Sequence, residues 1–107
     1  MHATKTYFTY IVTNKPRGTL YTGVTNDLQR RSFQHVCGQG SKFTTKYRLK
    51  YLVWYEGFCD VETAILYEKR IKRWRRAWKF DLIEGLNPNW NDLSVAHFGR
   101  DPRSSRG

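Results

Sequence analysis

The sequence predicts a small α/β sandwich in which a three-stranded, mostly antiparallel sheet is flanked by helices. Two runs rich in β-branched and aromatic residues surround a Pro-Gly turn, a third apolar run lies in mid-chain, and amphipathic segments follow the second and third runs. The length of 107 residues suits one domain, and 17 aromatic residues can build a small core. The expected order of elements is β-β-α-β-α-α.

The first two strands are expected at residues 7–13 (YFTYIVT) and 19–24 (TLYTGV). Both segments alternate β-branched and aromatic residues, which favours strands. Pro16 and Gly18 lie between them and are typical of a turn. The two segments therefore predict a β-hairpin.

A helix is expected over residues 28–36 (LQRRSFQHV), with Asn26 or Asp27 as its N-cap. Gly38 and Gly40 are expected to end it. The segment that follows, residues 37–48 (CGQGSKFTTKYR), is expected to be a glycine-rich loop.

The second half of the chain begins with residues 51–56 (YLVWYE), an apolar run that predicts a central strand. Asp60 is placed to cap the next helix. Helical periodicity then continues to Gly85, with a break expected near Trp74. Residues 94–107 lack apolar periodicity and are expected to form a basic, flexible tail, so the folded domain is expected to span residues 1–93.

The charge indicates the class of partner. The chain has 19 Lys and Arg residues against 9 Asp and Glu, a net charge of +10, which favours a polyanion such as nucleic acid, with a membrane surface as the alternative. No segment has the roughly 20 apolar residues of a membrane span or the apolar core of a signal peptide. We therefore expect a soluble cytoplasmic protein that does not act at a membrane. Cys37 and Cys59 are too few and too far apart for a disulfide scaffold or a zinc site.

Seven of the basic residues lie between positions 69 and 79, interleaved with Trp74 and Trp78. Cations and aromatic rings together suit phosphate contacts and base stacking. The alternative is that the tryptophans form the core stripe of an amphipathic helix whose charged face is solvated. The candidate nucleic-acid-binding residues are Lys69, Lys72, Arg73, Arg75, Arg76 and Lys79.

One carboxylate does not fit this basic helix. Glu68 falls on the same helical arc as four apolar residues expected in the core, namely Val61, Ala64, Ile65 and Ile71. A carboxylate on a buried face is costly unless it is paired or binds a cation. The alternatives are thus a cation site and a salt bridge to Lys72, one turn further along the helix.

Polar residues of the first helix and the hairpin form a second candidate group. Arg31 and His35 are four residues apart, on one side of the helix, at the edge of its apolar face. Tyr10 and Tyr21 lie within the two strands, where a tyrosine usually packs in the core. Gly23 leaves room for the close approach of a ligand or another chain segment. The hairpin can bring the two phenols together.

These residues occur in an order that resembles the GIY-YIG nuclease superfamily, in particular its small single-domain bacterial members. The half-motifs are Thr9-Tyr10-Ile11 and Tyr21-Thr22-Gly23, and the similarity runs from about residue 7 to residue 93. Tyr-x-Gly is followed eight residues later by Arg31, then by His35 and by Glu68 on a distal helix. No glycine precedes Tyr10 where the superfamily motif has one. The polar residue expected after the Glu helix is assigned to Asn87, with Asn89 and Asn91 close by.

The resemblance implies a metal-dependent phosphodiesterase. Glu68 would hold a single Mg²⁺ or Mn²⁺, which keeps most of its waters and takes its remaining oxygens from the substrate. Tyr10, helped by Tyr21, would act as general base or position the attacking water. A phenol is a poor base at neutral pH, so the cation and Arg31 are expected to favour its ionised form.

The resemblance also implies roles for the neighbouring residues. Arg31 would stabilise the pentavalent phosphate with its planar fork of donors. His35 would orient a tyrosine or shuttle a proton. Gly23 would let the strand approach the site, and Asn87 would support it.

The expected function is a DNA endonuclease that acts in repair or recombination and either has low sequence specificity or is recruited to its substrate by a partner protein. The first alternative is a nucleic-acid-binding module, for DNA or RNA, that has the nuclease fold and cleaves little or not at all. A binding module has no need of a carboxylate that repels phosphate, so Glu68 favours the enzyme. A basic ribosome-associated or membrane-associated protein is a third alternative, supported by the charge alone.

Overall fold

The computed structural model describes residues 5–94 and confirms the predicted fold class, a three-stranded antiparallel sheet flanked by helices. The strands match the predicted ranges within one or two residues. The expected tail lies outside the described residues except for Ser94. The elements are β1 (Tyr7–Thr13), β2 (Leu20–Thr25), α1 (Leu28–Val36), α2 (Lys42–Tyr47), β3 (Tyr51–Phe58), α3 (Val61–Arg73) and α4 (Arg76–Leu86).

The strand order is β2-β1-β3, and both pairings are antiparallel. The expectation that residues 51–56 form the central strand is therefore wrong, because β3 is an edge strand and β1 is central. The apolar run of β3 has another cause: helices cover both faces of this small sheet. Leu52 packs in the core on one face and Val53 in the core on the other.

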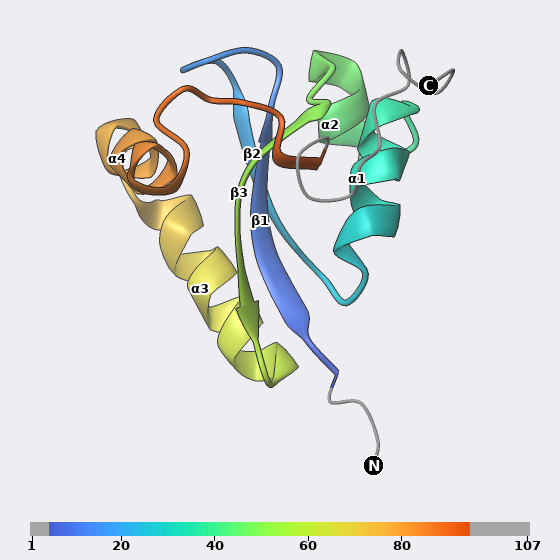
Figure 1. Ribbon diagram of the computed structural model, residues 1–107, viewed down its shortest axis with the longest axis vertical. Helices are drawn as coiled ribbons and strands as arrows, with labels where there is room; N and C mark the ends of the chain where they lie inside the picture. The colour runs from blue at the N-terminus through green and yellow to red at the C-terminus, as the bar shows by residue number, and fades with distance from the viewer. Residues whose placement is uncertain (1–4, 95–107) are drawn as a thin grey trace.

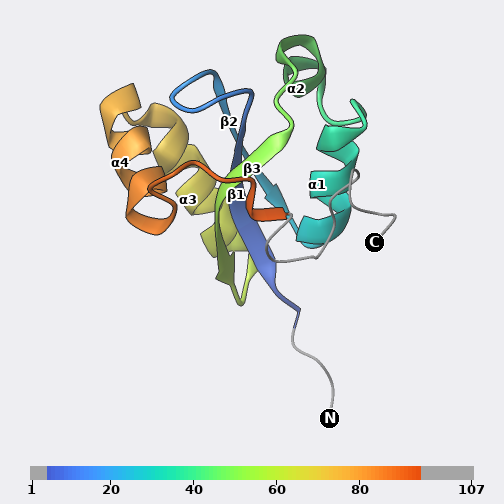
Figure 2. The ribbon, with the colours of Figure 1, turned by 45° about the horizontal axis from the view of Figure 1, so that its top comes forward.

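Helices form the two outer layers of the sandwich. Helices α3 and α4 cover one face of the sheet, and α1 and α2 lie on the other (Figures 1 and 2). Each face has its own core of apolar side chains. The α3/α4 face buries Ile11, Val53, Trp54, Ile71, Ile83 and Trp90. The α1 face buries Tyr10, Val12, Leu28, Leu49 and Leu52.

The predicted caps and the predicted break are confirmed. A carboxylate oxygen of Asp27 accepts a hydrogen bond from the Arg30 amide at 3.1 Å, and Asp60 accepts one from the Thr63 amide at 2.9 Å. The basic helix divides into α3 and α4, with an extended backbone at Trp74. Helix α4 ends at Leu86, one residue beyond the predicted end.

The segment expected to be entirely a glycine-rich loop contains a short helix, α2. The Ser41 hydroxyl caps it by accepting a hydrogen bond from the Thr44 amide at 3.2 Å. Arg48 ends it in the left-handed conformation, with a φ of 59°. A six-residue helix is too short to show an apolar period, so its cap was the only signal of it in the sequence.

Helix α3 buries fewer of its apolar residues than the sequence predicted. Ala64 and Ile71 are fully buried, but Val61 and Ile65 are 38% and 37% exposed. The helix lies across a sheet of only three strands, which covers a narrow stripe of it. Within residues 5–94, none of the helices is long and apolar enough to cross a membrane.

Candidate active site

Tyr10 and His35 form the buried centre of the candidate site. Tyr10 lies in the central strand and His35 on α1, and they are 2% and 3% exposed. The phenol oxygen of Tyr10 is 3.1 Å from Nε2 of His35. This hydrogen bond joins the sheet to the helix layer that covers it.

Gly23 makes room for the phenol. It lies directly opposite Tyr10 in the β1–β2 pairing. A Cβ atom at position 23 would lie 2.6 Å from the phenol oxygen and 2.7 Å from the ring carbon that bears it. Only glycine therefore allows the ring to lie across β2, and the phenol reaches toward that edge of the sheet.

The surroundings of His35 indicate which ring nitrogen carries its hydrogen. Nδ1 is buried and has no hydrogen-bond partner among the described residues, and a Cβ at Gly40 would lie 2.4 Å from it. Because an orphaned buried N–H is rare, we assign the hydrogen to Nε2, which then donates to Tyr10. Burial, and to a lesser extent the charge of Arg31, lower the pKa of His35 to about 4, so the ring is neutral at neutral pH.

Arg31 lies one turn before His35 on α1 and is half-buried. Its guanidinium is close enough to Tyr10 to lower the pKa of the phenol, and Nη1 donates to Oε1 of Gln34 at 3.0 Å. Arg31 also lines an open cavity of about 240 Å³ between the end of β2 and α1. Arg31 thus lies between the buried phenol and a cavity that is open to the outside.

Burial holds the pKa of Tyr10 well above the usual value of a phenol. Arg31 opposes this shift, whereas Tyr21 and Glu68 add to it, and burial is the largest cause. The expectation that Arg31 helps to ionise the phenol is right in sign, but Arg31 does not overcome burial. Tyr10 is therefore protonated at neutral pH in the protein as it stands.

Tyr21 lies on the edge strand β2, beside the buried pair. Its ring is 6.3 Å from the His35 ring and is stacked on Phe43 at 6.1 Å. The ammonium group of Lys72, from the opposite helix layer, is 5.5 Å from the ring centre. Side chains from both layers therefore meet at the β2 edge.

Glu68 is paired with Lys72, the alternative that the sequence left open. Oε2 of Glu68 is 2.6 Å from the Lys72 ammonium, and the Glu68 side chain is 18% exposed. The carboxylate is close enough to Tyr10 for its charge to affect the pKa of the phenol. It lies at the rim of the site, neither in the core nor fully in water.

The oxygen donors of this site fit a weakly held Mg²⁺ or Mn²⁺ ion. Within residues 5–94, no three His, Cys, Asp or Glu residues are grouped as a metal site. Glu68 supplies a hard carboxylate oxygen, since Oε1 is not part of its ion pair. Magnesium needs only one or two carboxylates when waters and phosphate oxygens complete its shell.

Comparison with known proteins identifies the family to which this chain belongs. The GIY-YIG catalytic domain matches residues 6–81. The chain belongs to the GIY-YIG family. This family comprises endonucleases, so this GIY-YIG domain has a nuclease-type function, which implies a nucleic acid substrate.

Relatives of this GIY-YIG domain occur in several bacteria. A UPF0213 protein of Bacillus pumilus is 42% identical over 69 residues, which cover 64% of this chain and 70% of that protein. One from Staphylococcus saprophyticus is 39% identical over 77 residues, 72% of this chain and 93% of that protein. The NMR structure of a UPF0213 protein from Bacillus halodurans matches with a TM-score of 0.53 and 28% identity, covering 86% of this chain and 97% of that one.

Not every predicted site residue lies in the cluster. Tyr10, Tyr21, Gly23, Arg31 and His35 come together there, with Glu68 at the rim. Asn87 lies outside this cluster, and its buried amide makes hydrogen bonds within the fold. It donates to the carbonyls of Val53 at 3.1 Å and Asn91 at 2.8 Å, and its oxygen accepts from the Asn91 amide.

Three of the six predicted nucleic-acid-binding residues make contacts within the fold. Arg76 donates to the carbonyls of Arg17 and Gly18 and so holds the hairpin loop. Lys79 donates to the Lys72 carbonyl at 3.4 Å, and burial is the largest cause of its lowered pKa. Lys72 pairs with Glu68.

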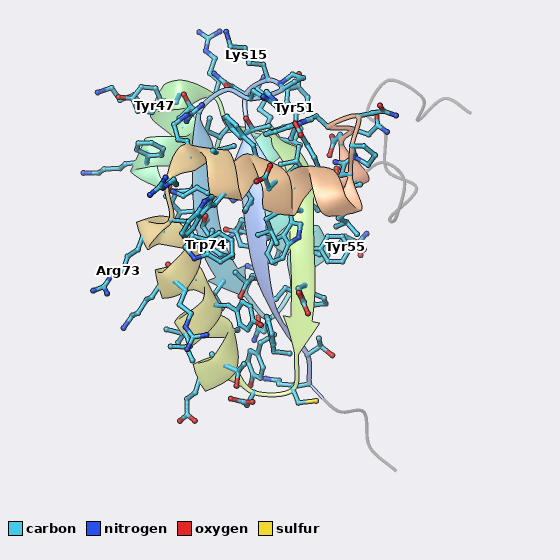
Figure 3. All side chains as sticks on the ribbon, turned by 90° about the vertical axis from the view of Figure 1, so that its left-hand side faces the viewer. Lys15, Tyr47, Tyr51, Tyr55, Arg73 and Trp74 are labelled. Atoms are coloured by element: carbon cyan, nitrogen blue, oxygen red, sulfur yellow. The ribbon has the colours of Figure 1, made fainter. Side chains whose placement is uncertain are left out.

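The other three basic residues are exposed. Lys69 and Arg73 lie on α3, and Figure 3 shows Arg73 extending away from the helix. Arg75 stacks on the half-exposed ring of Trp78 at 5.1 Å. Trp74 packs against the core, so the core interpretation of the tryptophans holds for Trp74 and not for Trp78.

Three contacts around the site were not predicted from the sequence. Gly40 packs against Nδ1 of His35, Phe43 stacks on Tyr21, and the Lys72 ammonium lies over the Tyr21 ring. Gly40 and Phe43 lie in the segment that was interpreted as a loop. The only signal that could have found them was the Ser41 cap, which marks the start of a short helix.

Proposed function

We propose that this GIY-YIG domain is a divalent-metal-dependent endonuclease that hydrolyses phosphodiester bonds in DNA with low sequence specificity. The supporting observation is the meeting at the β2 edge of a buried Tyr10–His35 pair, a half-buried arginine and a carboxylate from the opposite layer. Phosphodiester hydrolysis needs an oriented water, positive charge at the phosphate and a metal ligand. These residues can supply all three.

Arg31 is the residue that binds the scissile phosphate. It lines the open cavity and at the same time is close enough to Tyr10 for its charge to lower the pKa of the phenol. A guanidinium matches phosphate oxygens with parallel donors, which bind more tightly as negative charge builds up on them. A phosphate at Arg31 therefore lies beside the phenol.

Tyr10 orients the attacking water. Its oxygen accepts a hydrogen bond from His35 and lies near the charge of Arg31, so its own hydrogen is free to point to another partner. This hydrogen bond and the positive charge also favour the phenolate when a proton is to be passed on. His35 is neutral and acts by holding the phenol, because its pKa is too low for it to carry a proton at neutral pH.

Glu68 is the residue that would hold Mg²⁺ or Mn²⁺. A bound divalent cation supplies positive charge that acidifies water and neutralises the phosphate. Lys72 keeps the carboxylate at the rim of the site through the ion pair at Oε2. Tyr21, under the same ammonium group, forms the wall of the site along β2.

Low specificity follows from the kind of contacts available. Lys69, Arg73 and Arg75 are exposed cations suited to phosphates. Phosphate contacts fix the position of a nucleic acid and carry no information on its sequence. A recruiting protein would then select the cellular substrate.

Nicking of a supercoiled plasmid and of a branched duplex tests the proposal. The wild-type protein should nick with Mg²⁺ or Mn²⁺ and not with EDTA, and Arg31→Ala and Tyr10→Phe should each slow nicking at least about a hundredfold. Salt-sensitive binding with no nicking of any substrate would instead support the nucleic-acid-binding module.

A further inference from the structure

Three aromatic rings form a continuous row that leads out of the candidate site. Tyr21, at the site, is stacked on Phe43 with ring centres 6.1 Å apart and an interplanar angle of 30°. Phe43 in turn contacts Tyr47, with ring centres 4.8 Å apart. Both belong to α2, one turn apart. We name Phe43 and Tyr47 the α2 platform.

The α2 platform is not part of a core. Phe43 is 43% exposed and Tyr47 is 41% exposed, and neither ring packs in the two apolar clusters of the sheet. Helix α2 is anchored by other residues, with Thr44 and Leu49 buried beneath it. The exposed rings are therefore not explained by the stability of the fold.

The charge around the α2 platform matches a polyanion. Residues 28–55 contain six Lys and Arg residues and no Asp or Glu. Lys46 lies 5.2 Å from the ring centre of Tyr47, and Lys72 lies 5.5 Å from that of Tyr21. In Figure 3, Tyr47 and the exposed Arg73 lie on the same side of the molecule, with Tyr55 on the other. Alternating rings and cations are typical of surfaces that bind unpaired nucleotides.

We propose that the α2 platform stacks on unpaired bases next to the phosphate held at Arg31. This inference rests on the proposed function, because it takes nucleic acid as the substrate. Bases in a continuous duplex are stacked on one another and cannot offer a face to a side chain, whereas unpaired bases can. The α2 platform thus selects single-stranded nucleic acid, or a junction with unpaired bases, over intact duplex.

Binding of fluorescent oligonucleotides in EDTA tests this inference without cleavage. The ring-removing variant is Phe43→Leu/Tyr47→Leu, and the ring-preserving variant is Phe43→Tyr/Tyr47→Phe. Ring removal should weaken binding of a single strand about tenfold or more and binding of a duplex of the same sequence less than twofold. Ring preservation should leave both affinities at the wild-type value.

A fluorescent base reports the stacking itself. The emission of 2-aminopurine in the single strand should fall on binding to wild-type protein and not on binding to the ring-removing variant. Tyr51→Leu is the matched control, because Tyr51 is 44% exposed but lies on β3, at the opposite edge of the sheet. The emission of 2-aminopurine should fall on binding to Tyr51→Leu as it does on binding to the wild-type protein.

Two results would overturn the inference: equal losses of affinity for single strand and duplex, or unchanged 2-aminopurine emission on binding of wild-type protein. The outcomes also separate this inference from the proposed function. If the protein stacks on bases but shows no metal-dependent nicking, the proposed enzymatic function is refuted and the role of the α2 platform stands. If a ring-removing variant nicks DNA and binds single strands as the wild type does, only the role of the α2 platform is refuted.

Discussion

The ammonium group of Lys72 lies 2.6 Å from Oε2 of Glu68, and the same group is 5.5 Å from the centre of the Tyr21 ring. Both charged residues are on α3, one turn apart, whereas Tyr21 is on the edge strand β2. The lysine therefore occupies the space beside the carboxylate where a divalent cation would bind. If Glu68 holds the proposed metal ion, Lys72 would both keep the carboxylate at the site and compete with the ion for its charge.

Removing that competitor should strengthen metal binding. Lys72→Met keeps most of the apolar stem and deletes the charge, so the affinity for Mn²⁺, measured by electron paramagnetic resonance, should rise about two- to fivefold. The gain is small because half of the lysine side chain is in water, where an ion pair contributes little. Lys69→Met, on the same helix, should leave the affinity unchanged. Weaker Mn²⁺ binding by Lys72→Met would show that the lysine does not compete.

The space at Gly23 is predicted to be essential for the position of the phenol. Gly23→Ala adds a Cβ atom 2.6 Å from the Tyr10 oxygen, so the ring must move. We expect a loss of about 1 to 3 kcal/mol in unfolding free energy and about a hundredfold slower nicking. Gly85→Ala is the control: apart from its chain neighbours and the backbone of its own helix, nothing lies within 4 Å of its added Cβ, and alanine favours the helix by roughly 0.5 to 1 kcal/mol. Wild-type nicking by Gly23→Ala would refute this geometry.

His35 should make the stability of the protein depend on pH. Its pKa is lowered from 6.5 to about 4 on folding, so between these values the unfolded chain binds the proton and the folded chain does not. The associated stability is present above pH 6.5 and is lost as the pH falls toward 4. Between pH 7 and pH 5 the loss is about 2 kcal/mol. Urea unfolding should show this loss in the wild type and a smaller one in His35→Gln; parallel pH curves would argue against it.

The basic residues should separate into binders and fold-stabilising residues. Lys69→Ala/Arg73→Ala should lower the slope of log affinity against log salt by about 2, with little change in stability. Arg76→Ala should instead cost about 1 to 2 kcal/mol of stability, because it removes hydrogen bonds of 3.0 and 2.9 Å to the hairpin loop. DNA titrations at several salt concentrations and urea unfolding measure the two effects. An unchanged slope for the double variant would mean that this face of α3 is merely solvated.

The sequence predicted those parts of the fold that local signals determine. The alternation in β1 and β2, the turn at Gly18, and the carboxylate caps at Asp27 and Asp60 each act over a few residues, and all are confirmed. The position of β3 at the edge was not predictable in this way. An apolar strand covered by helices on both faces has the same pattern whether it is central or at an edge.

In the candidate site, too, some features could be predicted from the sequence, whereas others depend on packing. Tyr10, Tyr21, Gly23, Arg31 and His35 could be named because their order resembles a known family, and the hairpin register brings the first three together. The roles of individual cations could not be read from the sequence. Arg73 and Arg76 look alike there, and only the packing of α4 against the hairpin loop turns Arg76 into a fold-stabilising residue.

The most direct test of the proposed metal site compares the nicking of supercoiled plasmid by Glu68→Gln and Glu62→Gln in the presence of Mn²⁺. Both carboxylates are on α3, but Glu62 is exposed in its first turn, and only Glu68 pairs with Lys72 at the site. Glu68→Gln should lose metal-dependent nicking by at least about a thousandfold while it keeps its fold and its affinity for DNA, and Glu62→Gln should match the wild type. Metal-dependent nicking that persists in Glu68→Gln would contradict the role of Glu68 as the metal ligand.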